Sequence, residues 1–262
     1  MKDYRVFAPE GLGTIAPGED LLEKLSEALT EEQIQPQDGD ILVLAHKIVS
    51  KAEGRVFPLS QVRPSPRALE LARSTKKEAA LVELILRETA EVLWASKGLL
   101  LCRHRLGHVC ANAAVDCSNA GAGLAVLLPL DPDRSAAELR HGLEARFRCR
   151  LGVLICDTHG RPFREGAGGT VVGASGVRLL KSYIGQEDRD GRTMRSSVEA
   201  AGDELAAVAT LLMGQGSEGR PLVLIRGLDA LGNDTAADMV RDTKRDVLLS
   251  ALRNLRRGDT YE

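Results

Sequence analysis

The chain is organised around the stretch Leu154-Ile155-Cys156-Asp157-Thr158-His159-Gly160-Arg161-Pro162-Phe163-Arg164. Its first residues, together with Val153, form an apolar run that predicts a short buried strand. We expect Asp157 and Thr158 at the end of this strand, followed by a Gly/Pro turn and two arginines. A carboxylate and a hydroxyl that face cations suit a metal and phosphate site. The alternative is an Asx turn that ends the strand, with arginines that are merely solvated.

Apolar patterns on either side of this stretch predict a mixture of strands and helices. Short apolar runs indicate strands at residues 4–9, 41–45 and 222–225. Helices are expected at residues 20–29, 67–74, 76–89, 135–147, 196–213 and 236–252. The sequence has no internal repeat of solenoid length, so a repeat architecture is not expected.

Length and composition limit the class of protein. The 262 residues are 44% hydrophobic and 27% charged, which is typical of a globular protein with one large core or two medium ones. We expect two lobes within one domain, of about residues 1–90 with 210–262 and about 91–209. The net charge of −2 gives no general attraction to nucleic acid or an anionic membrane. Aromatic residues, at 3%, are too few for platforms that stack single-stranded nucleic acid.

The start of the chain and its cysteines bear on the compartment. No apolar signal segment follows Met1, and no window approaches the ~18 uninterrupted apolar residues of a membrane span. We therefore expect a cytoplasmic protein. The five cysteines are an odd number without a Cys-x-x-Cys pair, so neither a disulfide framework nor a zinc knuckle is expected. We interpret them as small buried apolar residues.

Two glycine-rich motifs lack the context that nucleotide binding requires. Gly214-x-Gly216-x-x-Gly219 has dinucleotide-binding spacing, but that motif must follow a strand and open a helix, and here it follows a helix. Gly13 to Gly18 has P-loop spacing, but Glu19-Asp20 replaces the required Lys and Ser/Thr. A Rossmann site and a Walker A site are therefore not expected.

Oxygen-bearing side chains remain as candidate ligands. They form three groups: Asp116 with Asn119, Asp157 with Thr158, and Gln215 with Glu218. Such oxygens suit Mg²⁺ or Mn²⁺, which bind nucleotide phosphates through one or two carboxylates. Lys51, Arg161 and Arg164 are candidates to neutralise phosphate charge. His104 and His108 lie in a basic stretch that would repel a cation, so we expect them to have packing or surface roles.

Eight stretches, in order from about residue 6 to residue 250, resemble the coenzyme F(420)-0:L-glutamate ligase family, the γ-glutamyl ligases of deazaflavin coenzyme biosynthesis. They are Glu10-Gly11-Leu12; Gly39-Asp40-Ile41-Leu42-Val43 with Ser50-Lys51-Ala52-Glu53-Gly54-Arg55; Val109-Cys110-Ala111-Asn112-Ala113-Ala114-Val115-Asp116-Cys117-Ser118-Asn119; Leu128-Pro129-Leu130-Asp131-Pro132-Asp133; Asp157-Thr158-His159-Gly160-Arg161-Pro162-Phe163-Arg164; Ala174-Ser175-Gly176-Val177; Asp203-Glu204-Leu205-Ala206-Ala207; and Leu211-Leu212-Met213-Gly214.

The resemblance implies an α+β fold with two lobes of mixed sheets and helices, in an intertwined homodimer. It also implies a stand-alone, GTP-dependent ligase that forms carbon–nitrogen bonds. Such an enzyme would join L-glutamate to the lactyl-phosphate carboxylate of coenzyme F(420)-0 and then add γ-linked glutamates, through an acyl phosphate. Its cations would be Mg²⁺ or Mn²⁺ at two sites, with K⁺ as a further candidate.

The same resemblance implies roles for individual residues. Asp116 and Asp157 would be metal ligands, Thr158 would meet a second metal, and Gln215 would contact metal or phosphate. Asp157 and Lys51 would be catalytic, because metals and lysine lower the repulsion between a carboxylate and the γ-phosphate. The residues lining the GTP site would be Gly11, Leu12, Gly13, Thr14, His46, Lys47, Lys51, Asn119, Met213, Gly214, Gln215 and Gly216.

Two positions depart from the family pattern. Gln215 stands where a relative has an acidic residue, which leaves its second-metal role open, and His46-Lys47 replaces small hydroxyl residues. Two other functions remain open from the sequence. One is a non-catalytic relative that binds a nucleotide or a deazaflavin, and the other is an amide ligase for a different carboxylate acceptor.

Overall fold

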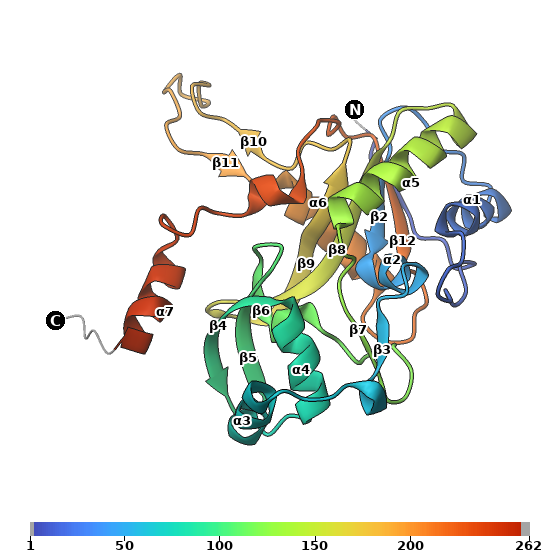
Figure 1. Cartoon of the computed structure of the whole chain (residues 1–262). Helices are drawn as coiled ribbons and strands as arrows, with labels where there is room; N and C mark the ends of the chain where they lie inside the picture. Colours follow the sequence, from blue (N-terminus) through green and yellow to red (C-terminus); the bar gives the residue numbers. More distant parts are fainter. Residues whose placement is uncertain (1–2, 258–262) are drawn as a thin grey trace. The chain divides into compact units, whose positions relative to one another are not determined.

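Strand β2 (Ile41–Ala45) lies inside the largest sheet of the computed structural model, which describes residues 3–257 (Figure 1). Its first four residues are fully buried. A strand covered on both faces is a continuous apolar run and shows no alternation, which explains the sequence Ile-Leu-Val-Leu. The strand order is β1-β12-β2-β8-β9, and only β2 and β8 pair in parallel. The other strands are β1 (Arg5–Phe7), β8 (Gly152–Arg161), β9 (Arg164–Ser175) and β12 (Leu222–Arg226).

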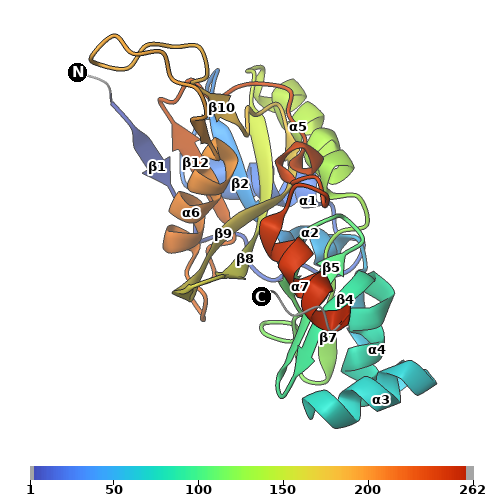
Figure 2. The ribbon, with the colours of Figure 1, turned by 90° about the vertical axis from the view of Figure 1, so that its left-hand side faces the viewer.

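Helices α5 (Pro132–Phe147) and α6 (Ala201–Met213) cover opposite faces of this sheet (Figure 2). Both approach β9 closely because glycine stands at the contacts. A Cβ atom on Gly173 would lie 2.5 Å from the Pro132 carbonyl of α5, and one on Gly169 would lie 2.4 Å from the Ala206 backbone of α6. Two further helices belong to the same part of the chain, α1 (Leu21–Glu31) and α2 (His46–Ala52).

The described chain forms two compact units. Unit 1 comprises the residues up to Glu53 together with Pro129–Met239, and it contains the five-stranded sheet. Unit 2 comprises Gly54–Leu128 and the residues from Val240 onward. These divisions fall at other points than the lobe boundaries near residues 90 and 210 that the sequence suggested. Unit 1 also contains the short strands β10 (Lys181–Ser182) and β11 (Val198–Glu199) and the 3₁₀ helix η3 (Ala236–Met239).

Unit 2 has its own core between a three-stranded sheet and two helices. The sheet order is β4-β5-β6, with both pairs antiparallel. The strands are β4 (Thr89–Ser96), β5 (Leu99–His104) and β6 (Val109–Ala111), and the two helices are α3 (Pro66–Thr75) and α4 (Ala79–Glu88). Helix α7 (Val247–Arg257) also belongs to unit 2. Strands β3 (Val56–Pro58) and β7 (Leu124–Val126) pair with each other, and the 3₁₀ helices are η1 (Leu59–Gln61) and η2 (Asn112–Ala114).

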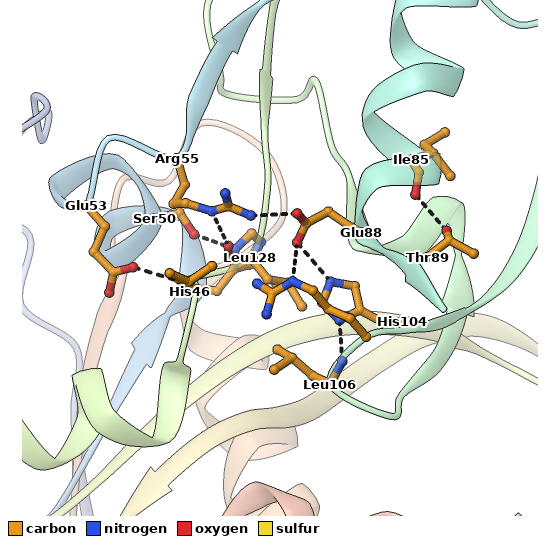
Figure 3. Close-up of polar contacts among 12 residues, drawn as sticks. His46, Ser50, Glu53, Arg55, Ile85, Glu88, Thr89, His104, Leu106 and Leu128 are labelled. Carbon is orange, nitrogen blue, oxygen red and sulfur yellow. Dashed lines mark hydrogen bonds and ion pairs between the residues drawn. The ribbon is translucent and has the colours of Figure 1, made fainter. Parts of the chain in front are cut away.

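A buried ionic cluster centred on Glu88 ties the elements of unit 2 together (Figure 3). The Glu88 carboxylate accepts from Arg55 Nη2 at 2.8 Å and from Arg105 Nε at 3.1 Å, and His104 Nε2 lies 3.3 Å away. Burial alone would raise the pKa of the Glu88 carboxyl, but His104 and the two arginines outweigh it and lower this pKa to about 2. We call these four residues the Glu88 cluster.

The structure confirms the mixed α+β class and corrects three local expectations. The helix expected at 196–213 begins at Ala201, because Val198 and Glu199 form β11 instead. The helix expected at 236–252 is split into η3 and α7 by Asp242, whose side chain accepts from the Lys244 N–H and so competes with helix formation. Strand β8 continues to Arg161, so Asp157 and Thr158 lie inside it and not at its end.

Among residues 3–257, no helix is long and apolar enough to cross a membrane.

Candidate functional site

The parallel register of β2 and β8 brings His46 next to Asp157. Ala45 of β2 is paired with Cys156 of β8. The residues that follow them, His46 and Asp157, therefore lie side by side at the same end of the two strands. His46 is the first residue of α2 and is buried. Its Nε2 atom lies 3.5 Å from Oδ1 of Asp157, and its Nδ1 atom lies 3.3 Å from the hydroxyl of Ser50, one turn later.

His159 approaches the same carboxylate from the strand itself. Residues i and i+2 of a strand share one face, so Asp157 and His159 project together. Nε2 of His159 lies 3.2 Å from Asp157 Oδ2, and the Thr158 N–H donates to Oδ1 at 2.7 Å. Burial alone would raise the pKa of the Asp157 carboxyl, but His46, His159 and this N–H lower it to about 2. The carboxylate is therefore ionised at neutral pH.

Thr158 joins β8 to the loop that follows α6. The Thr158 hydroxyl donates to Gln215 Oε1 at 3.1 Å. Gly214 ends α6 with φ +73°, and a Cβ atom there would lie 2.2 Å from the Glu218 carboxyl carbon. Glu218 accepts from the Gly216 N–H at 2.8 Å. The loop thus closes around Glu218 and turns the Gln215 side chain toward β8, which requires glycine at position 214.

Helix α2 contributes two cations next to His46. Lys47 and Lys51 lie four residues apart on this helix, so their ammonium groups are neighbours. Burial lowers the pKa of Lys51, and the charge of Lys47 lowers it further. Two like charges held together are relieved by an anionic ligand, so this helix suits a phosphate group.

The N-terminal loop is tied to both of these segments. Arg220 Nη1 lies 3.8 Å from Glu10 Oε1, which links the loop after α6 to the segment Gly11–Thr14. The Gly18 N–H donates to the Ala52 carbonyl at the end of α2 at 2.9 Å. Gly13 has φ +65°, which favours glycine at this turn. Leu12 and Met213 are buried apolar side chains, and Met213 belongs to the core beneath α6.

Asp116 and Asn119 lie in unit 2, on a segment with unusual backbone geometry. Asn112, Ala113 and Ala114 have φ values of 54°, 49° and 56°, three successive left-handed residues without a glycine. Asp116 then accepts from the Ser118 N–H at 2.8 Å and from its hydroxyl at 2.7 Å. The conformation costs energy and positions this loop, as strained backbone at functional sites often does. That Asp116 and Asn119 meet Asp157 stays a prediction.

The oxygen donors in unit 1 fit a divalent cation of the Mg²⁺ type. Asp157 supplies an ionised carboxylate, while Thr158 and Gln215 supply a hydroxyl and an amide oxygen, and hard cations prefer such ligands. Because successive strand residues point to opposite faces, the carboxylate and the Thr158–Gln215 pair are two separate sets of donors. The Asp157 carboxylate has about four lone-pair sites, and the Thr158 N–H donates to one of them, so acceptor capacity remains for a cation. Within residues 3–257, no three His, Cys, Asp or Glu side chains are grouped so that they alone could hold a metal ion.

Sequence reasoning did not include His159 among the site residues. The alternation of a strand could have found it, since Asp157 and His159 are two apart, but the expected strand ended at Cys156. Arg161 and Arg164 are exposed at the far end of the β8–β9 hairpin, and Arg161 donates to the Glu165 carbonyl at 3.0 Å. Their role as anion contacts stays a prediction.

Comparison with known proteins identifies the family of this chain. Residues 11–227 match the family described as F420-0:Gamma-glutamyl ligase. A protein of Archaeoglobus fulgidus named Coenzyme F420:L-glutamate ligase is 42% identical over 248 residues, which cover 95% of this chain and 97% of that protein. Proteins of the same name from Methanopyrus kandleri and Methanothermobacter thermautotrophicus are 43% and 44% identical, over 89% and 83% of this chain and 92% and 86% of their own lengths. The chain therefore belongs to the F420-0:gamma-glutamyl ligase family.

Proposed function

We propose that this protein is a GTP-dependent ligase that joins L-glutamate to coenzyme F(420)-0 and then adds γ-linked glutamates. Family membership supports the ligase class and the coenzyme substrate. The observation that carries the GTP and metal dependence is in unit 1, where the ionised Asp157 lies beside the Thr158–Gln215 pair. Lys47 and Lys51 lie on α2, which begins directly after β2, the strand that pairs with β8.

The chemistry requires two anions to meet. The acceptor carboxylate attacks the γ-phosphorus of GTP, the bond to the β-phosphate oxygen breaks, and an acyl phosphate and GDP result. The glutamate amine then attacks the acyl carbon, phosphate leaves, and the amine loses a proton as the amide forms. A divalent cation at Asp157 would neutralise charge at the reacting groups, as would a second cation at Thr158 and Gln215 and the Lys51 ammonium group at the phosphates.

The test is incubation of the purified protein with GTP, L-glutamate, coenzyme F(420)-0 and Mn²⁺ or Mg²⁺, followed by mass spectrometry. We expect glutamylated product, with one GDP released for each glutamate added. Asp157→Ala should lower turnover by at least about 100-fold, since it removes a preorganised charge at the reacting groups. Asp229→Ala is the control, because Asp229 is exposed and lies outside the site. Absence of glutamylated product with either metal would contradict the proposal, and near-normal turnover by Asp157→Ala would contradict the role of that residue.

The same reaction separates the ligase from a binding protein of the same fold. A ligase releases GDP in a single turnover only when the acceptor is present. A carrier or regulator would bind GTP or the deazaflavin without acceptor-dependent release. A homodimer, a second metal site, K⁺ and a cytoplasmic location stay predictions from the resemblance.

A further inference from the structure

Asp157 is held between two imidazoles, one on each carboxylate oxygen. His46 Nε2 contacts Oδ1 at 3.5 Å, and His159 Nε2 contacts Oδ2 at 3.2 Å. The two histidines come from different elements, the first turn of α2 and the strand β8. A carboxylate held from both sides has a fixed plane, whereas an unsupported aspartate rotates freely about its last torsion angle.

The surroundings of each histidine fix its orientation in turn. Ser50, which is fully buried, meets the other nitrogen of His46 at 3.3 Å. This contact fixes the plane of the His46 ring, with Nε2 facing Asp157. On the other side, Asp203 in the first turn of α6 accepts from the Val171 N–H at 2.9 Å, and its carboxylate interacts electrostatically with His159.

From this geometry we propose that His159, together with His46, is a positioning residue that orients the Asp157 carboxylate toward a divalent cation. We call these three residues the Asp157 clamp. The inference rests on the proposed function for the identity of the cation, and it assigns to His46 a contact with Asp157 in place of a contact with the nucleotide. In this arrangement the imidazoles hold the carboxylate, and the carboxylate is the ligand.

The arrangement is that of the outer partners found around many metal sites. Residues that hydrogen-bond a ligating group fix its orientation, and their loss typically lowers metal affinity by 10- to 100-fold. The effect should appear in metal binding itself, before any chemistry. A histidine that only fills space would instead be replaceable by an apolar ring of similar size.

The experiment measures Mn²⁺ binding to the full chain by electron paramagnetic resonance, with GTP present and no acceptor. We expect His159→Phe, which keeps an aromatic ring without its nitrogens, to weaken Mn²⁺ binding about 10- to 100-fold. We expect His159→Gln to bind within about threefold of the wild type, because its amide N–H₂ lies near the position of imidazole Nε2. His141→Gln is the control, since His141 lies on an exposed part of α5. Circular dichroism verifies that each variant is folded.

Every outcome bears on the clamp. Mn²⁺ affinity of His159→Phe within about threefold of the wild type would overturn it, as would a wild type that does not bind Mn²⁺. If the Phe variant does not fold, a loss greater than tenfold in the folded Gln variant overturns it as well. A wild type that binds Mn²⁺ through the clamp but yields no glutamylated product refutes the proposed ligase and leaves the clamp standing.

Discussion

Neutralising Glu88 should destabilise unit 2 by an amount that depends on pH. Glu88 is 5% exposed and lies within 3.3 Å of Arg55, Arg105 and His104. Its pKa is lowered from 4.5 to about 2. Since one pKa unit corresponds to about 1.4 kcal/mol, the ionised carboxylate contributes about 3 kcal/mol at neutral pH. Glu88→Gln should lower the free energy of unfolding by about this amount, and the two arginines would lose their common partner.

The sign of the pH dependence follows from the direction of the shift. The folded-state pKa lies below the unfolded-state pKa, so the stabilisation is fully present above about pH 4.5 and is lost as the pH falls toward 2. The difference between wild type and Glu88→Gln should therefore be constant from pH 7 to pH 5. Near pH 3 it should have fallen to roughly half.

Urea unfolding followed by tryptophan fluorescence measures this difference. Trp94 is the single tryptophan of the sequence and lies in β4, directly after Glu88, so its emission reports on unit 2. Glu70→Gln on α3 is the matched control. Its ion pair with Arg67 is more than half exposed at both partners and should contribute less than about 0.5 kcal/mol. A penalty for Glu88→Gln below about 1 kcal/mol, or one that stays unchanged down to pH 3, would refute the reasoning.

Three further substitutions test the backbone and the core of each unit. Ala114→Gly should raise the free energy of unfolding by about 0.5–1 kcal/mol, because glycine relieves the cost of the left-handed conformation and this gain exceeds the extra entropy of glycine in the unfolded chain. A loss of stability in a urea titration would contradict this. Gly169→Ala should lower the melting temperature, because the new Cβ would clash with the backbone of α6 at a cost of about 1–3 kcal/mol or more. Gly160→Ala on the same hairpin is the control, since a Cβ there meets open space. Equal melting temperatures of the two variants would show that α6 shifts to accommodate the Cβ atom. The Asp40 carboxylate is fully buried, and Arg226 contacts it through two nitrogens. Asp40→Asn removes its charge and should lower the free energy of unfolding by about 3–5 kcal/mol in chemical denaturation. A loss under about 1 kcal/mol would mean that the ion pair contributes little.

Local pattern was sufficient for most of the elements. The apolar run at β2 and the helical spacing of α1, α3 and α4 predict these elements close to their true positions, because burial on two faces leaves a continuous apolar run and burial on one helical face leaves a periodic one. The errors lie where side chains compete with the backbone. Asp242 divides the expected C-terminal helix, and a two-residue strand pair takes residues from the start of α6.

The sequence by itself determined the mixed α+β class, the family and the residue types of the site. Asp157, Thr158 and Gln215 could be named from motifs, because each motif is a short contiguous stretch. Only the tertiary structure decided what surrounds them. His46 reaches Asp157 because β2 and β8, which are far apart in the sequence, pair in parallel. Gln215 reaches Thr158 because α6 ends next to β8. Contacts of this kind depend on register and on packing between distant segments, and neither leaves a local pattern in the chain.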